Sequence, residues 1–232
     1  MAANATHELL TPLTGVRANL EEAHMHPEDA PVAVHNALYT LRRLEAIVAD
    51  LIVLTLIPGR PDGVNQSMDL ACLVAADVAR RQSSRIRPPC HIQMELTKGA
   101  IVDGSFSLLT RIVTTLIDHA AAFAATRVSV AVLRHGRSVM LSVSNDGDVI
   151  REDDRERIFE PFHQRDTDRR TTYGATGVGL TVAREITEAY GGNIRVENVH
   201  PGVRFLVRLP FSSSEAAEEE SSEGRRPVHS PA

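Results

Sequence analysis

Apolar residues within the first 57 positions recur at helical spacing and predict two helices. The first stripe steps by four, three and four residues and consists of Leu9, Leu13, Val16 and Leu20. It stops at residues 26–31, where two prolines indicate a turn. The second stripe consists of Val34, Leu38, Leu41, Val48 and Leu51. We therefore expect a helical hairpin, packed either on a second copy as a dimeric four-helix bundle or on its own domain.

Residues 67–211 mix the helical pattern with the alternation that is typical of strands. Helical spacing covers about 70–82, 105–124 and 178–190. Alternation of apolar and polar side chains predicts strands around 92–96, 128–132, 139–143 and 203–209, with a hairpin turn at His135-Gly136-Arg137. Because strands and helices do not alternate strictly, we expect an α+β chain in which helices cover one face of a single sheet.

Composition marks the boundaries of these regions. Residues 58–66 hold two prolines and two glycines, which is typical of a linker. From residue 212 the chain is rich in Ser and Glu and has almost no large apolar side chain, so we expect a disordered acidic tail over 212–232. The predicted organisation is a hairpin over 1–57, a linker over 58–66, a mixed domain over 67–211 and the tail.

Overall composition excludes several classes of protein. Among 232 residues, 43% are hydrophobic and 24% charged, which are ordinary globular values. Aromatic residues make up 4%, Trp is absent and the net charge is -5, which argues against a nucleic-acid partner. Cys72 and Cys90 alone form neither a disulfide framework nor a zinc site. No run reaches the roughly 18 apolar residues of a membrane span, so we expect a soluble intracellular chain.

The first predicted helix carries a candidate nucleophile in residues 7–13, His-Glu-Leu-Leu-Thr-Pro-Leu. An exposed imidazole can attack phosphorus when a base holds its other nitrogen, and Glu8 is adjacent to His7. Pro12 removes a helical hydrogen bond and is expected to bend the helix just after His7. For such a pair taken alone, a solvated histidine beside a glutamate is the commoner explanation.

A glycine-rich segment precedes the last predicted helix. Gly174, Gly177 and Gly179 let backbone N–H groups approach an anion at the helix N-terminus. The preceding residues 163–173 are polar and do not form a strand, which excludes a dinucleotide-binding fold and favours a mobile lid over a nucleotide. A simple turn is the alternative for the glycines alone.

A second polar motif, Asn145-Asp146-Gly147, follows the strand expected at 139–143. A short polar side chain at a strand end can contact an adenine edge, and Gly147 permits a close approach. A turn that ends the strand explains the motif equally well in isolation.

Taken in order, these motifs resemble the transmitter core of bacterial two-component sensor histidine kinases. The order is His-Glu-x-x-Thr-Pro-Leu, a long helix, Asn-Asp-Gly, the run Arg-Glu-Arg-Ile-Phe-Glu-Pro-Phe at 155–162, and Gly-x-Thr-Gly-x-Gly-Leu at 174–180. The likeness covers residues 5 to about 210. It implies a dimerisation and phosphotransfer hairpin at 1–57 and a catalytic ATP-binding α/β sandwich, similar to that of gyrase-type ATPases, at 67–211.

The resemblance also implies roles for individual residues. His7 is the expected phosphorylated histidine, Glu8 the base that orients it, and Thr11 a residue that positions water during dephosphorylation of a response regulator. The expected nucleotide contacts are Asn145 and Gly147 at the adenine, Phe159 and Phe162 bracing the lid or docking on the hairpin, and Gly174, Thr176, Gly177, Val178, Gly179 and Leu180 in the lid.

The family implies ATP and Mg²⁺ as cofactors. It also implies a homodimer and the receiver domain of a response regulator as partners. Members normally continue upstream into a signalling helix and often a membrane segment. We therefore expect a cytoplasmic chain that reaches the membrane only through such a segment.

The helix expected at 105–124 departs from the family pattern on one face. Thr115 and His119 stand where the family usually has Asn, and Ala122 stands where a Lys or Arg commonly meets phosphate. Steps of four and three place all three on the same face, which the resemblance points at the triphosphate. His119 is the candidate metal ligand there, although Mg²⁺ prefers oxygen ligands to imidazole.

Three functions remain open at this point. The first is an autokinase that phosphorylates His7 from ATP and passes the phosphoryl group to a response-regulator aspartate, weakly if the altered face matters. The second is a kinase-impaired regulator, such as a phosphatase or scaffold. The third uses the same fold for an unrelated ligand. A benign alternative for the face itself is that water and phosphates hold Mg²⁺.

Overall fold

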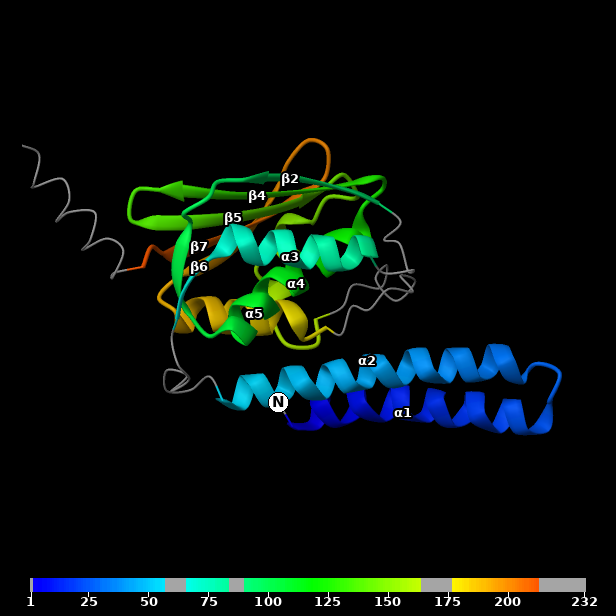
Figure 1. Ribbon diagram of the computed structural model, residues 1–232. Coiled ribbons are helices and arrows are strands. Elements are labelled where there is room, and N and C mark those ends of the chain that lie inside the picture. Colours follow the sequence, from blue (N-terminus) through cyan, green and yellow to red (C-terminus); the bar gives the residue numbers. More distant parts are fainter. Residues whose placement is uncertain (1, 57–65, 84–89, 164–176, 213–232) are drawn as a thin grey trace, which may run out of the picture. The chain divides into compact units, whose positions relative to one another are not determined.

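The computed structural model describes residues 2–56, 66–83, 90–163 and 177–212, with only the backbone described for 2–8 and 56 (Figure 1). Contacts divide the chain into two units, Met1–Gly59 with Glu156–Val182, and Arg60–Arg155 with Ala183–Ala232.

The N-terminal region is the predicted helical hairpin. Helices α1 (Ala2–Met25) and α2 (Ala30–Leu56) are joined by a short turn and pack along each other, and α1 continues through Pro12. Gly15 of α1 lies against Thr40 of α2, and Ala33 and Ala37 of α2 are buried.

Much of the two predicted apolar stripes remains exposed in the single chain. The exposed members are Leu13, Leu20, Val34, Leu38, Leu41 and Val48, and Leu10 and Ile52 are exposed beside them. The hairpin therefore buries Ala33, Ala37 and Ile47 of α2 and leaves many of its larger apolar side chains exposed.

The second unit is built on a five-stranded sheet in the order β2-β4-β5-β7-β6. Its strands are β2 (His91–Leu96), β4 (Arg127–His135), β5 (Ser138–Asn145), β6 (Asn193–Asn198) and β7 (Val203–Pro210). Only the β2–β4 pair is parallel in this sheet. The predicted hairpin turn is confirmed, since His135 pairs with Ser138 and Gly136 adopts a φ of 58°.

The sequence-based prediction missed three strands. Strands β1 (Gln66–Asp69) and β3 (Ile101–Gly104) form a separate antiparallel pair, and each has only four residues. Such short strands are too brief to show alternation clearly. The third is β6 at the sheet edge.

Helices cover one face of the five-stranded sheet, as predicted. These are α3 (Leu70–Ser83), α4 (Phe106–Phe123) and residues 183–189 of α5 (Gly179–Ala189) (Figure 1). The alternate residues Val128, Val130 and Val132 of β4 are buried. Leu109, Ile112, Leu116 and Ile117 of α4 are buried too, because this helix contacts β4 and β5. Their burial makes α4 the central helix of the core.

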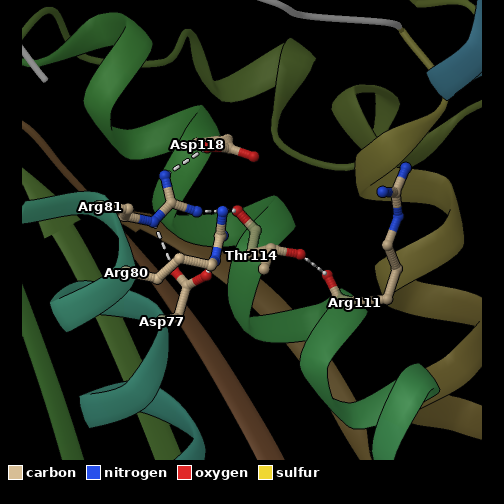
Figure 2. Close-up of polar contacts among 6 residues, drawn as sticks. All are labelled: Asp77, Arg80, Arg81, Arg111, Thr114 and Asp118. Carbon is tan, nitrogen blue, oxygen red and sulfur yellow. Dashed lines mark hydrogen bonds and ion pairs between the residues drawn. The ribbon is translucent and has the colours of Figure 1, made fainter. Parts of the chain in front are cut away.

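Arg81 joins α3 to α4 (Figure 2). Its guanidinium donates to Asp77 on its own helix, to Asp118 of α4 and, at 3.2 Å, to the carbonyl oxygen of Thr114. The Asp77 side chain is 2% exposed and also accepts from Arg80. Burial acts to lower the pKa of Arg81, but the carboxylates of Asp118 and Asp77 outweigh it and raise that pKa above its ordinary value.

We expect Arg81→Ala to destabilise the protein by about 3 kcal/mol, because it removes a partner from a buried carboxylate. Arg80→Ala is the matched control: it removes the same charge from the same Asp77, yet the Arg80 side chain is 67% exposed. Its loss is expected to stay below about 1 kcal/mol. Urea unfolding measures both free energies, and equal losses would contradict the role given to Arg81.

Candidate functional site

Asn145 and Gly147 hold the end of β5 against the C-terminal end of α4. The last carbonyl groups of a helix lack partners within the helix. Asn145 Nδ2 donates to one of them, the carbonyl oxygen of Ala120, at 3.2 Å. A Cβ atom on Gly147 would lie 1.7 Å from the carbonyl oxygen of Phe123, so no other residue fits there unchanged. The close approach that this glycine permits is therefore to the protein's own helix.

The other end of the Asn145 amide is a buried, unpaired acceptor. The side chain is 5% exposed, and Oδ1 has no hydrogen-bond partner among the described residues. Flipping the amide would set Oδ1 against the Ala120 carbonyl oxygen, so the contact with Ala120 fixes its orientation. A buried acceptor without a partner costs about 1–3 kcal/mol. A ligand that donates a hydrogen bond, such as the amino group of a purine, would remove this cost.

Asp146, between these two residues, anchors the turn that leads from α4 to β4. Its carboxylate accepts hydrogen bonds from the Thr126 hydroxyl and from the backbone N–H groups of Ala125 at 3.0 Å, Thr126 at 2.9 Å and Arg127 at 2.9 Å. The Thr126 hydroxyl is the largest cause, followed by the backbone donors, of a pKa of Asp146 well below its usual range. Sequence reasoning gave Asp146 no role of its own.

Two further contacts fix the chain on either side of this motif. A Cβ atom on Gly202, which has a φ of 91°, would lie 2.0 Å from the carbonyl oxygen of Asn145. The Asn198 side chain bonds both backbone groups of Ile150, accepting from its N–H at 3.0 Å and donating to its carbonyl at 2.8 Å. The backbone around Asn145 is thus held before any ligand binds.

The altered face of α4 carries Thr115, His119 and Ala122, all partly buried. The His119 ring packs between two phenyl rings, with its centroid 4.8 Å from that of Phe123 and 5.1 Å from that of Phe205, edge to face. Burial lowers the pKa of His119 to about 4, so the imidazole is neutral at neutral pH. These three side chains therefore offer no positive charge to a phosphate.

The Phe-Glu-Pro-Phe and glycine-rich motifs meet through one backbone hydrogen bond. The N–H of Phe162 donates to the carbonyl oxygen of Gly177 at 2.7 Å. Both residues adopt a positive φ, 64° at Phe162 and 71° at Gly177. Phe159, Val178 and Leu180 are buried. Gly179 begins α5.

Several predicted site residues lie partly or wholly outside this description. Gly174 and Thr176 are outside the described residues, and His7 and Glu8 are described only as backbone of α1. Thr11 is exposed on α1. Within the described residues, no three His, Cys, Asp or Glu side chains gather as a metal site, and no helix is long and apolar enough to cross a membrane.

The depressed pKa of His119 predicts a pH dependence of stability. Its folded value of about 4 lies below the ordinary 6.5, so the unfolded chain binds more protons between these values and stability falls as the pH drops through them. The whole effect amounts to about 3 kcal/mol. The His119→Phe variant cannot titrate in this range. We therefore expect its free energy of unfolding to fall by about 3 kcal/mol less than that of the wild type as the pH drops. Urea unfolding between pH 6.5 and pH 4 measures the difference.

His135→Phe is the matched control, because it makes the same substitution at an exposed position on β4. If both variants follow the wild type as the pH falls, burial of a neutral His119 does not explain the loss of stability.

Comparisons with protein families match two regions of the chain to two models. Residues 1–58 match the His Kinase A (phospho-acceptor) domain, and residues 104–213 match the histidine kinase-, DNA gyrase B- and HSP90-like ATPase. Among solved structures, the Acinetobacter baumannii histidine kinase AdeS has a TM-score of 0.71 at 21% identity, covering 89% of this chain and 98% of that one. Histidine kinase ThkA in complex with response regulator protein TrrA has a TM-score of 0.72 at 21% identity, covering 93% of this chain and 62% of that one. Both likenesses show the fold.

Curated relatives agree with the two models. Sensor protein ChvG of Agrobacterium fabrum is 29% identical over 92% of this chain and 39% of its own length. Sensor histidine kinase RppB of Synechocystis is 29% identical over 91% and 48%, and sensor protein CutS of Streptomyces coelicolor is 30% identical over 89% and 51%. The chain spans about half the length of the curated relatives it matches. A phosphoacceptor domain followed by this ATPase domain shows that the chain belongs to the two-component sensor histidine kinases, of which it carries the transmitter core.

Proposed function

We propose that the chain is a histidine autokinase that transfers the γ-phosphoryl group of ATP to His7 and then to an aspartate of a response-regulator receiver domain. The observation that carries the proposal is the presence on one chain of a phosphoacceptor helix and an ATPase sheet in the family's order. The structural likeness to ThkA, which was solved with a response regulator, supports the choice of partner. In this proposal residues 1–57 are the phosphotransfer hairpin, 58–66 the linker and 67–211 the catalytic domain, all working in the cytoplasm.

The chemistry proposed for α1 uses a neutral imidazole. A ring nitrogen of His7 forms a bond to the γ-phosphorus while the bond to the bridging oxygen breaks and ADP leaves. Glu8 accepts the proton of the other ring nitrogen. In the second step the P–N bond breaks as an aspartate oxygen of the receiver domain bonds to phosphorus, and Glu8 returns its proton to the leaving imidazole. Thr11, exposed on the same helix, positions water when the regulator is dephosphorylated.

The geometry around Asn145 supports adenine as the base. Its Oδ1 is buried, unpaired among the described residues and fixed as an acceptor. The amino group of adenine is a donor, whereas the carbonyl group at the same position of guanine or hypoxanthine is an acceptor. The family usually has Asp at this position, and the amide of Asn145 offers the same acceptor without its charge.

The exposed apolar side chains of the hairpin support a homodimer. Two helices alone cannot enclose a core. The outward-facing side chains include Leu13, Leu20, Leu38 and Leu41. A second hairpin would cover these side chains in a four-helix bundle. In a dimer, each ATPase domain also has a choice of His7 on its own chain or on its partner.

A kinase-impaired regulator is the second candidate, and the altered face of α4 favours it. Ala122 has no polar side-chain atom, and His119 packs between Phe123 and Phe205. Loss of one charged or hydrogen-bonding contact to a transition state typically lowers a rate about 10²- to 10³-fold. The hairpin residues His7, Glu8 and Thr11 would then serve a phosphatase, a scaffold or an acceptor for another kinase.

Incubation with γ-labelled ATP tests the autokinase proposal. We expect slow labelling that is acid-labile, as a phosphohistidine is, and that is absent in His7→Ala. The double variant His119→Asn/Ala122→Arg is expected to label at least about tenfold faster, because it restores an amide and a cation to the face. Lack of label in a wild-type protein that still binds ATP would reject the autokinase and favour the impaired regulator.

Substitution of Asn145 tests the base contact. We expect Asn145→Ala to weaken ATP binding about tenfold, because it removes the acceptor for the amino group. It should also abolish the preference for ATP over inosine triphosphate, a ratio that a general loss of fold would not change selectively. Asn193→Ala, the same substitution at an exposed residue of β6, is the matched control. Calorimetry measures all affinities, and an unchanged preference in Asn145→Ala would refute the contact.

A further inference from the structure

We propose that this chain binds its nucleotide without help from Mg²⁺, because the face of α4 that the family directs at the triphosphate has no set of ligands for the ion. The inference rests on the proposed function, in that it takes ATP as the ligand. It goes beyond that function by stating which form of the nucleotide the site recognises.

The donors on this face do not suit Mg²⁺. The ion takes six oxygen ligands in near-ideal octahedral geometry, and in proteins it favours carboxylate and amide oxygens. Ala122 supplies no polar atom, and His119 supplies nitrogen, which suits softer metals. Thr115 is left with a single neutral hydroxyl group.

Two neighbouring oxygen-bearing side chains of α4, those of Asp118 and Thr114, are engaged elsewhere (Figure 2). The Asp118 carboxylate pairs with Arg81 of α3. The Thr114 hydroxyl donates to the carbonyl oxygen of Arg111 in the preceding turn, at 3.2 Å. Neither group can turn to a nucleotide without giving up a contact within the fold.

The motif after β5 does not replace the missing ligands. The Asp146 carboxylate already accepts three backbone N–H groups and the Thr126 hydroxyl. Asn145 is oriented by Ala120, and its one free acceptor is the atom assigned above to the base.

His119 is also held in place by packing. Its ring contacts Phe123 on the next turn of α4 and Phe205 on β7, with centroid separations of 4.8 and 5.1 Å. Rings at these separations and tilts attract one another. Rotating the imidazole toward a phosphate would break both contacts. Its surroundings are those of an aromatic core residue.

This geometry has a thermodynamic consequence. If the protein adds no ligand to the ion, it binds Mg²⁺ on ATP no better than free ATP does. By linkage, Mg²⁺ then leaves the affinity for ATP unchanged. Mg²⁺ is then coordinated by the phosphates of ATP and by water. Binding of ATP to the protein depends on contacts with the base and on backbone contacts.

Calorimetry of the full chain with ATP, in EDTA and in saturating MgCl₂, tests the inference. We expect the two dissociation constants to agree within about twofold, whereas typical coupling between two ligands changes affinity about 5- to 150-fold. Tighter binding in Mg²⁺ by about tenfold or more would overturn the inference and leave the autokinase proposal standing. Absence of binding in both conditions would overturn both.

Two variants test which residue explains why Mg²⁺ leaves ATP binding unchanged. His119→Asn puts an amide oxygen on the face and is expected to make ATP binding tighten when Mg²⁺ is added. Ala122→Arg is its counterpart, which adds a cation but no metal ligand and should tighten binding in both conditions, at least as strongly in EDTA as in MgCl₂. If ATP binding by His119→Asn does not tighten when Mg²⁺ is added, the packed His119 is not the reason why Mg²⁺ leaves ATP binding unchanged. The explanation given by the inference would then be wrong. Labelling of His7 from ATP is measured in a separate experiment. Absence of label would reject the autokinase proposal but would not test whether Mg²⁺ affects ATP binding.

Discussion

The direct contact of the Gly147 backbone with the Phe123 carbonyl is the constraint on which the nucleotide-binding region depends. It requires the end of β5 to touch the end of α4, with no side chain between them. Once they touch, Asn145 reaches the Ala120 carbonyl and Asp146 reaches the backbone that starts β4. The contact of Gly147 with Phe123 therefore fixes where α4 ends and β4 begins, and it sets the orientation of Asn145 Oδ1.

The opposite side of α4 is held by a charge network. Arg81 bonds Asp118 and the Thr114 carbonyl, so α3 and α4 are fixed to each other near the turn that precedes His119. Helix α4 is thus anchored by ions on one side and by the β5 motif at its end. Because these contacts set the backbone of α4, we expect substitutions at positions 119 and 122 to change the chemistry of the face more than its position.

Periodicity predicted the elements of this fold whose signal is local. The hairpin helices, α3 to α5 and four of the five strands of the main sheet follow from apolar spacing. The role of Asp146 does not, because its partners lie 19 to 21 residues earlier in the chain. Nor does the orientation of Asn145, since Ala120 fixes it across 25 residues. The motif at Asn145–Gly147 could be recognised from the sequence. The sequence could not show that Asn145 Oδ1 is the atom left without a partner among the described residues.

In the proposed function, the altered face of α4 and the hairpin motif affect different reactions. Transfer from ATP needs the triphosphate to be held and its charge neutralised at α4, where Ala122 gives no cation and His119 is neutral. The proposed removal of phosphate from a response regulator depends on the hairpin, which keeps His7, Glu8 and Thr11. In the proposed function, a change confined to α4 would therefore slow phosphorylation of His7 without slowing hydrolysis of the regulator's aspartyl phosphate, which is a separate reaction. The proposed function therefore predicts a lowered ratio of kinase to phosphatase activity, with nucleotide bound at Asn145 still stabilising the fold around β5.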